Sequence, residues 1–357
     1  MAAYNGGEYL KTSVESILHQ TYRDFEFLII DDCSTDDSLR FVESLKDQRI
    51  RIYRNPVNIG QTKSLNVGLK LARGKYVARI DADDLAFPSW LQIQFSFIKN
   101  NPQYAAVSAK AVVMDSSNRI KKVLNSTLNF DDVIFRSLTA SPINHVGVMM
   151  QKNIILEETL GYDERLKIAA DYELWSTLLR KGYKLISTPQ VSMAIRVHRH
   201  SLSRTENKTE LSEVAEIIYK NIQSLTTLPI NPSQAKLIAG FFYTPARLNS
   251  DDFQAAQAIL ESAYKNLKLD FISNPRITRW KVVNLIGRIY VKRILESPEI
   301  SPKGMREISI QYMRRYGAFN VFVLLFAVSF LGKFVVRNIP SLYAHSCMIW
   351  TKLRLPN

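Results

Sequence analysis

Two groups of aspartates follow directly after predicted β-strands, and this placement constrains the fold and the site together. Asp31 and Asp32 end a short apolar run over residues 25–30, and a second group at residues 81–84 ends a run over residues 76–80. Short apolar runs bounded by polar residues are typical of buried strands. Ligands of parallel sheets bind beyond the carboxyl ends of the strands, so both groups are expected to face one crevice.

Helical and strand patterns alternate along the first 120 residues. Strands that alternate with helices indicate an α/β fold, with a mainly parallel sheet covered by helices on both faces. From about residue 206 the strand signals disappear, so we predict one domain over residues 1–205 and a helical, basic extension over residues 206–357. The spacing of apolar residues predicts helices over residues 7–20, 37–45, 63–72 and 88–99, and further strands over residues 50–53 and 105–114.

The chain is basic, with 47 Lys and Arg against 33 Asp and Glu and a net charge of +14. More than half of this excess lies beyond residue 250. A basic region favours anionic partners such as nucleic acid, phospholipid headgroups or phosphorylated substrates. We expect no nucleic-acid partner, because the sequence has no interleaved aromatic and basic motif and no helix-turn-helix pattern. Cys33 and Cys347 lack metal-site spacing and are predicted to be free thiols in a reducing compartment.

One segment, residues 317–332, is strongly apolar and carries no charge, with Arg314, Arg315 and Lys333 beside it. A helix that spans a membrane needs about 20 apolar residues, and this segment is shorter. Two interpretations remain open. The segment is either a buried helix, or a membrane-embedded or interfacial helix whose flanking basic side chains reach the headgroups.

Asp81 and Asp83 form a D-x-D pattern immediately after a predicted strand. Two carboxylates at this spacing can turn toward one divalent cation, and hard oxygen ligands suit Mg²⁺ or Mn²⁺. Such a cation stabilises the negative charge that develops on a leaving diphosphate. Acidic pairs also occur in many surface turns, so the pattern acquires its meaning from the residues around it.

The aspartates belong to an ordered series of motifs that resembles the family 2 glycosyltransferases of the GT-A fold over roughly residues 2–205. The resemblance implies a Rossmann-like GT-A domain and an inverting transfer of one sugar from a nucleoside-diphosphate sugar to an acceptor hydroxyl. The matching motifs are Ala3-Tyr4-Asn5-Gly6, residues 16–26, residues 31–36, Asn58-Ile59-Gly60, Asn66-Val67-Gly68, residues 72–76, residues 79–84, Asn144-His145, residues 161–164 and residues 170–175.

The resemblance implies a donor site in the first half of the chain. Tyr4 and Asp32 match the contacts to the donor base, with Asp31 beside them. Asp81 matches the residue near the ribose and the metal, and Asp83 matches the principal metal ligand. A carboxylate accepts hydrogen bonds from uracil and from guanine alike, so the base is not decided, although a UDP-sugar is favoured.

Basic residues complete the donor site that the resemblance implies. Lys63 is expected to approach the donor, or else to be a solvated lysine. A late motif that begins at Arg196 matches the family's R-x-H-x-x-S-x-S. Arg196 or Arg199 suits the diphosphate because of the planar fork of guanidinium donors. His198 is expected to donate to the phosphate or to ligate the metal.

Asp171 matches the catalytic base of the family. An inverting transfer needs a carboxylate opposite the leaving diphosphate, to take the proton of the acceptor hydroxyl. The family carries Glu-Asp at this point, whereas this chain carries Ala170-Asp171. Asp171 can also be the N-cap of the helix that follows. His145 is interpreted either as an acceptor-side residue or as a packed core histidine.

The start of the chain departs from the family pattern, because only Met1, Ala2 and Ala3 precede the Tyr-Asn turn. We interpret the first central strand as truncated, or the start as lying upstream, with neighbouring backbone groups left unpaired. This motivates one alternative function, a catalytically silent glycosyltransferase-like module that binds a membrane or a partner. A nucleotidyltransferase would need a basic, Gly-rich phosphate loop, which residues 4–8 do not form.

The main interpretation is therefore a cytoplasmic enzyme, peripheral at the inner face of the cell membrane. We expect it to use a nucleoside-diphosphate sugar and a glycan or lipid-linked acceptor, in surface polysaccharide or glycolipid synthesis. The basic extension and the segment over residues 317–332 are expected to contact the membrane surface.

Overall fold

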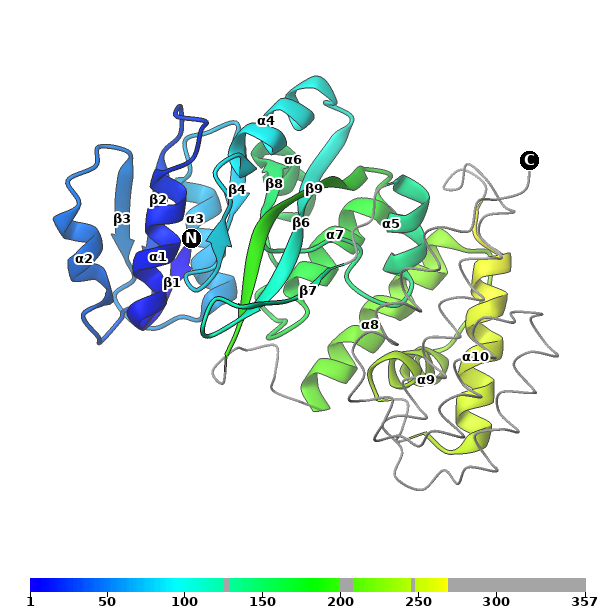
Figure 1. Ribbon diagram of the computed structural model, residues 1–357. Helices are drawn as coiled ribbons and strands as arrows, with labels where there is room; N and C mark the ends of the chain where they lie inside the picture. The colour runs from blue at the N-terminus through cyan, green and yellow to red at the C-terminus, as the bar shows by residue number, and fades with distance from the viewer. Residues whose placement is uncertain (125–128, 199–207, 245–247, 269–357) are drawn as a thin grey trace. The chain divides into compact units, whose positions relative to one another are not determined.

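The computed structural model describes the chain except for residues 125–128, 199–207, 245–247 and 269–357 (Figure 1). Its described residues form two compact units, Met1–Leu225 and Thr226–Lys268. The domain boundary predicted near residue 205, Cys347 and the apolar segment at residues 317–332 all lie outside the described residues. The predicted division into two domains at residue 205 stays a prediction.

Three parallel strands near the start of the chain form a first sheet. They are β1 (Ala2–Ala3), β2 (Phe27–Asp31) and β3 (Ile50–Arg54), in the order β1-β2-β3. The two residues of β1 pair only with Ile30 and Asp31 of β2. The amino group of Met1 donates to the carbonyl oxygen of Leu28 at 3.0 Å. Burial, assisted by the charge of Arg79, lowers the pKa of this amino group to about 5.

The second sheet has six strands in the order β4-β8-β6-β9-β5, with β7 paired to β6. Only β6 and β9 run parallel in it, and the other pairs are antiparallel. The parallel arrangement that the sequence predicts therefore describes the first sheet, whereas the second is mixed. One reason is that β6 and β7 are joined by a short turn, which only antiparallel neighbours allow. The strands are β4 (Tyr76–Arg79), β5 (Leu85–Ala86), β6 (Tyr104–Asp115), β7 (Ile120–Val123), β8 (Val148–Gln151) and β9 (Lys184–Val197).

Helices cover both sheets, and their apolar faces form the core. Leu10, Val14 and Ile17 of α1 are buried, as their helical spacing predicts, together with Trp90 and Ile98 of α4. The first unit contains α1 (Gly7–Leu18), α2 (Ser38–Ser44), α3 (Gln61–Leu71), α4 (Trp90–Asn100), α5 (Phe130–Ser137), α6 (Lys152–Thr159), α7 (Ala170–Arg180) and α8 (Lys208–Leu225). The second unit contains α9 (Pro232–Tyr243) and α10 (Ser250–Lys265).

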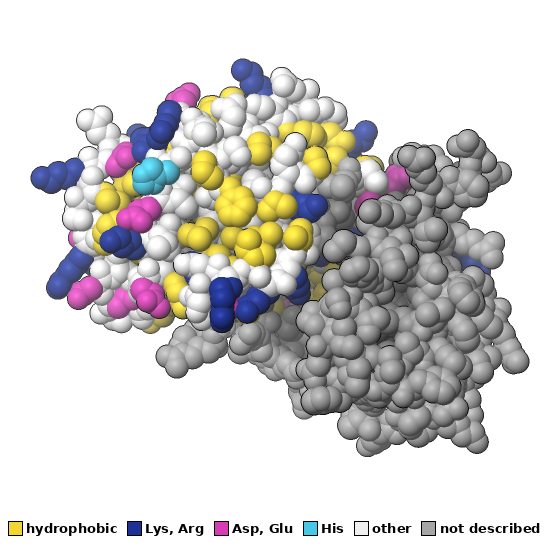
Figure 2. Space-filling view, in the orientation of Figure 1, with side chains coloured by type: hydrophobic (Ala, Val, Ile, Leu, Met, Phe, Trp, Pro, Cys, Tyr) yellow, Lys and Arg dark blue, Asp and Glu magenta, His cyan; other side chains and the backbone are white. Residues whose placement is uncertain are grey.

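A smaller apolar cluster lies on the second sheet, apart from this core. Figure 2 shows apolar side chains gathered over β6 and β9 on the face of the first unit that it presents. The cluster consists of buried Val112, Met114 and Ala194, with Leu85, Phe87 and Val191 partly buried against them.

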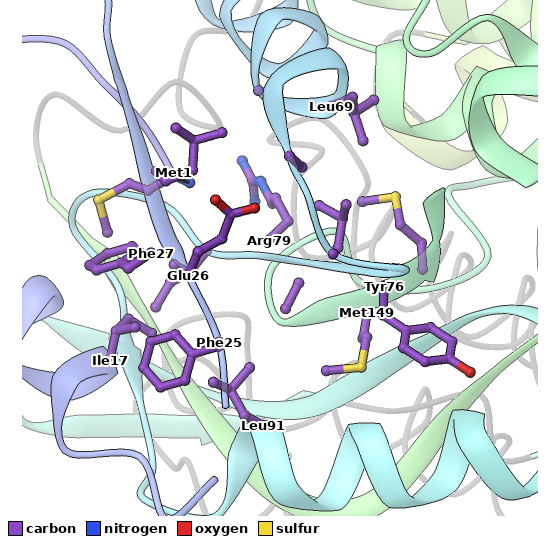
Figure 3. Close-up of a pocket in the computed structure, with 18 of the residues that line it drawn as sticks. Met1, Ile17, Phe25, Glu26, Phe27, Leu69, Tyr76, Arg79, Leu91 and Met149 are labelled. Atoms are coloured by element: carbon purple, nitrogen blue, oxygen red, sulfur yellow. Dashed lines mark hydrogen bonds between the residues drawn. The ribbon is translucent and has the colours of Figure 1, made fainter. Parts of the chain in front are cut away.

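A cavity of about 590 Å³ separates β2 of the first sheet from β4 of the second. Figure 3 shows Phe25 and Phe27 on one side of this cavity and Tyr76 and Met149 on the other. Arg79 also lines it, although its side chain is only 5% exposed. The cavity is therefore apolar along most of its wall and carries one buried cation.

Candidate active site

Two turns at the carboxyl ends of β1 and β2 are bonded to each other. The side-chain oxygen of Asn5 accepts from the amide of Thr35 at 2.8 Å, and the amide of Asn5 donates to Ser34 Oγ at 3.0 Å. The amide of Gly7 donates to Ser38 Oγ at 2.9 Å. Tyr4 precedes this junction and is 50% exposed, so its ring is accessible to a ligand.

The two aspartates that end β2 are buried and hold neighbouring loops. Asp31 accepts from Arg54 Nε at 2.6 Å and from the amide of Ser34 at 3.0 Å. Asp32 accepts from the amides of Ile59 at 2.9 Å and Gly60 at 2.8 Å. Burial opposes the ionisation of Asp32, but these amides, with Asn55 and Ser64, lower its pKa below the usual value. Both carboxylates thus position the loops of the predicted nucleotide pocket.

The start of α3 brings a side chain to the second aspartate group. Gln61 Nε2 donates to Asp81 Oδ1 at 3.2 Å. Lys63, one of the predicted donor contacts, is exposed in the same helical turn. The sequence carried no signal for Gln61, because its contact with Asp81 depends on how α3 packs beside β4.

Three aspartates in the turn after β4 form an acidic cluster, defined here as Asp81, Asp83 and Asp84. One carboxylate oxygen from each lies within 4.8 Å of the others. Burial and the negative charge of Asp83 raise the pKa of Asp81, although Arg79 opposes this. Burial and the other two aspartates raise the pKa of Asp84 well above its usual value. The sequence assigned metal-binding roles to Asp81 and Asp83 and placed Asp84 in the same acidic group without giving it a role.

The end of β9 returns to this acidic cluster. His198 Nε2 lies 2.9 Å from Asp83 Oδ2, and the amide of Arg196 donates to Asp84 Oδ1 at 2.7 Å. Arg196 Nε donates to the carbonyl oxygen of Asp83 at 2.9 Å, and the guanidinium lies 4.6 Å from the ring centroid of Tyr9. Arg196 is 3% exposed and therefore braces the acidic turn. Arg199 lies outside the described residues.

The acidic cluster with His198 fits a divalent cation. Its atoms are carboxylate oxygens and an imidazole nitrogen, which suit Mg²⁺ or Mn²⁺. Burial, and after it the repulsion between the neighbouring carboxylates, raises the pKa of Asp81 and Asp84. A bound cation would remove this repulsion, and Asp81, Asp83, Asp84 and His198 are the residues that would hold it.

Arg79 is a buried cation beside the acidic cluster. It bonds the carboxylate of Asp81, and its charge also acts on Asp84 and Asp171. Its Nε and Nη1 atoms are buried and have no hydrogen-bond partner among the described residues. Arg79 is therefore a buried cation that bonds Asp81 and acts electrostatically on Asp84 and Asp171. The sequence motif contained Arg79, but only the fold shows this position.

Asp171 lies in the first turn of α7, and Ala169, not Asp171, is the N-cap. Ser141 Oγ donates to Asp171 Oδ2 at 3.3 Å. Burial raises the pKa of Asp171, although the amide of Tyr172, the charge of Arg79 and the bond from Ser141 oppose it. Asp171 is thus a buried carboxylate whose protonated form is favoured by burial and whose ionised form is favoured by Arg79 and Ser141.

His145 lies in the packed region behind these groups. Its Nε2 is 2.8 Å from the hydroxyl of Tyr162, and its ring meets that of Trp175 at 6.0 Å between centroids. Burial and the charge of Arg79 lower its pKa well below the usual value, so the ring is neutral near pH 7. The packing interpretation of His145 agrees with these contacts.

Comparison with known proteins decides the family. Residues 1–160 match the family model described as Glycosyl transferase family 2. An uncharacterized glycosyltransferase of Haemophilus influenzae is 31% identical over 232 residues, which cover 62% of this chain and 72% of the relative. This chain belongs to glycosyl transferase family 2.

Two further likenesses agree with this membership. An Escherichia coli glycosyltransferase, the UDP-Glc:alpha-D-GlcNAc-diphosphoundecaprenol beta-1,3-glucosyltransferase WfaP, is 30% identical over 220 residues, which cover 58% of this chain and 80% of the relative. The structure of Staphylococcus aureus TarS residues 1–349 in complex with UDP-GlcNAc superposes with a TM-score of 0.54 at 16% identity, covering 82% of this chain and 86% of TarS. The GT-A fold expected from the sequence is confirmed.

Membership in glycosyl transferase family 2 makes the protein a transferase enzyme. The catalytically silent module is not favoured, because the structure retains both Asp171 and the acidic cluster. Within the part of this glycosyltransferase that the structure describes, no helix is long and apolar enough to cross a membrane.

Proposed function

We propose that the protein is an inverting glycosyltransferase that moves one sugar from a nucleoside-diphosphate sugar, with a UDP-sugar favoured, to an acceptor hydroxyl. One observation carries this proposal. Asp171 and the acidic cluster, which lie far apart in the sequence, both interact with the buried cation of Arg79. A group that can take a proton and a cluster that can hold a diphosphate through a cation therefore act on the same buried guanidinium, which bonds Asp81 directly.

The donor half of the crevice is formed by the turns after β1, β2 and β4. The exposed ring of Tyr4 can stack on the base, and the ordered turns held by Asp31 and Asp32 surround it. TarS was solved with UDP-GlcNAc, and the name of the E. coli relative contains UDP-Glc. These two proteins support a UDP-sugar as the donor of this chain.

The proposed transfer step accounts for the proton of the acceptor and for the electron pair of the bond that breaks. As the acceptor oxygen bonds to the anomeric carbon, its proton passes to the Asp171 carboxylate, and the bond to the diphosphate breaks with its electron pair on the leaving oxygen. A divalent cation bound at the acidic cluster would supply charge stabilisation for that leaving group. Burial favours this proton transfer, because it raises the pKa of Asp171 and so its basicity.

The acceptor is proposed to be a glycan or a lipid-linked glycan at the inner face of the cell membrane. The name of the E. coli relative gives a sugar linked to diphosphoundecaprenol as its acceptor. The excess of basic residues beyond residue 250 supports binding to an anionic membrane. Flotation of the full chain with anionic liposomes tests this part, and protein that stays at the bottom would contradict it.

Isothermal titration of UDP with and without Mn²⁺ tests the donor site. We expect binding that depends on Mn²⁺ and is lost in Asp83→Ala. Glu43→Gln, which changes an exposed acid on α2, is the matched control and should bind like the parent. Binding that is equal with and without Mn²⁺, or equal in Asp83→Ala, would contradict the proposed metal site. Binding of GDP or dTDP in place of UDP would correct the base.

A further inference from the structure

Helix α8 lies beyond the residues that match the family model, yet it belongs to the same compact unit as the candidate active site. Glu213 on this helix points inward and is only 8% exposed. Its carboxylate accepts three backbone hydrogen bonds, from the amides of Lys167 at 2.9 Å, Ile168 at 3.0 Å and Ala169 at 3.0 Å. Hydrogen bonds from backbone amides to a carboxylate are charge-assisted and therefore stronger than bonds between neutral groups.

These amides belong to the loop that leads directly into the helix carrying Asp171. Ala169 is the N-cap of α7 and provides no side-chain cap. The backbone amides of residues 167–169 precede the helix and have no helical partner, so they need an acceptor, which the Glu213 carboxylate supplies. Glu213 is therefore the acceptor that orders the backbone two residues before Asp171.

The same helix also holds the second side of the Asp171 environment. Asn221 of α8 donates to the carbonyl oxygen of Ser137 at 2.7 Å and to Ser176 Oγ at 2.8 Å. Ser137 ends α5, four residues before Ser141, which donates to the Asp171 carboxylate. Glu213 of α8 thus bonds the loop before Asp171, and Asn221 of α8 bonds the end of α5, near Ser141.

The residue that precedes Asp171 in the sequence agrees with this role of Glu213. The family motif carries an acid immediately before the catalytic aspartate, and this chain carries Ala170 there. Alanine has no carboxylate, so position 170 supplies no side-chain acceptor to the loop. Glu213 brings a carboxylate to the same loop from a helix about 40 residues later in the sequence.

We propose that Glu213 is a positioning residue for Asp171, and that α8 is therefore part of the catalytic unit of the transferase. This inference rests on the proposed function, because it takes Asp171 as the base. A purely structural role for Glu213 predicts that its loss lowers stability and affects donor binding and transfer alike. A positioning role predicts a loss confined to the transfer step, since the donor turns lie on β1, β2 and β4.

Glu213→Gln separates the two roles. The amide side chain keeps the size of Glu213 but replaces one of the two accepting oxygens with a donor. We expect kcat for sugar transfer to fall about tenfold, since small misplacements of a reacting group are costly. The Kd for UDP with Mn²⁺ should stay within about twofold, because a positioning residue for the base leaves ground-state donor binding unchanged. Hydrogen exchange at the amides of residues 167–169 should accelerate.

Glu216→Gln is the matched control, because Glu216 lies on the same helix, is exposed and pairs with Lys220 at 2.8 Å. It should leave kcat and amide exchange unchanged. Glu213→Asp, which keeps the charge on a shorter side chain, should recover part of the lost kcat.

Two results would overturn the inference. One is an unchanged kcat in Glu213→Gln beside an inactive Asp171→Asn, which would remove only the positioning role. The other is a parallel loss of UDP affinity, kcat and melting temperature, which would make Glu213 a general stabiliser. Full activity of Asp171→Asn is a different outcome, because it would refute the base itself and with it the proposed function.

Discussion

The imidazole of His198 lies 2.9 Å from the carboxylate of Asp83, a contact between residues 115 positions apart. This contact joins the end of β9 to the turn after β4, so the imidazole lies beside the acidic cluster. The ring of His198 also lies against that of Tyr9, with 5.1 Å between centroids, which limits its orientation. His198 is therefore held where it can share a cation with Asp83.

Replacing His198 should weaken metal-dependent donor binding without unfolding the protein. For His198→Ala we expect the apparent Kd for Mn²⁺ in the presence of UDP to rise about tenfold, as is common for residues that support a metal site. Titration calorimetry measures this. His19→Ala is the control, since His19 is exposed at the C-cap of α1 and its ring bonds the carbonyl oxygen of Glu15. Equal Mn²⁺ affinity in both variants would exclude His198 from the metal site.

The raised pKa of Asp171 predicts the acid limb of the pH profile. The base must be ionised, so kcat should fall as the pH drops through a pKa above the usual value of about 3.9 for Asp. The contribution of Asp171 to folding stability changes with pH in the opposite direction to kcat. The folded state binds the proton more tightly, so the contribution of Asp171 falls as the pH rises from the unfolded pKa to the folded one.

Asp171→Asn tests both statements at once. At neutral pH it should lower kcat by about 10²- to 10⁴-fold, the usual contribution of a general base. It should also leave the melting temperature unchanged or raise it, because the cost of a buried charge disappears. Steady-state kinetics and calorimetric melting measure the two effects. A variant that loses stability together with activity would show that the carboxylate has a structural role.

Arg79 should be a large determinant of stability. Arg79→Met removes the cation between Asp81 and Asp171 and leaves carboxylates uncompensated, which typically costs about 3–5 kcal/mol for a buried pair. Denaturant unfolding measures this. Arg165→Met, at a side chain that is 85% exposed, should unfold like the parent. A stability equal to that of the parent in Arg79→Met would mean that the acidic groups are protonated in the metal-free protein.

Gly161 is required by a close approach as well as by its backbone angle. Its φ is +96°, and a Cβ there would overlap the side-chain oxygen of Asn66. That oxygen accepts from the amide of Tyr162 at 2.8 Å. Gly161→Ala should therefore destabilise by more than Gly182→Ala, whose φ is +85° with nothing near the added carbon. Equal changes in the unfolding midpoint would mean that the contact with Asn66 contributes nothing.

Local patterns in the sequence predicted most of the first unit. The helix over residues 7–20 is α1, and the strands over residues 50–53 and 76–80 are β3 and β4, each within a few residues. The aspartates that end β2 and those that follow β4 were also predicted at strand ends, although the two strands belong to different sheets. These features depend on neighbours in sequence, so periodicity and strand ends are enough to predict them.

Contacts between distant segments were decided only by the tertiary structure. Gln61 donates to Asp81 from α3, Arg196 turns inward to bond the turn of the acidic cluster, and Arg79 bonds Asp81 from a buried position. None of these follows from residue type or spacing, because each depends on which strand lies beside which. Glu213 is the clearest case, since α8 lies outside the family match and reaches the loop before Asp171 only through packing. The sequence by itself determined which chemistry the chain carries, and the fold decided which side chains hold it in place.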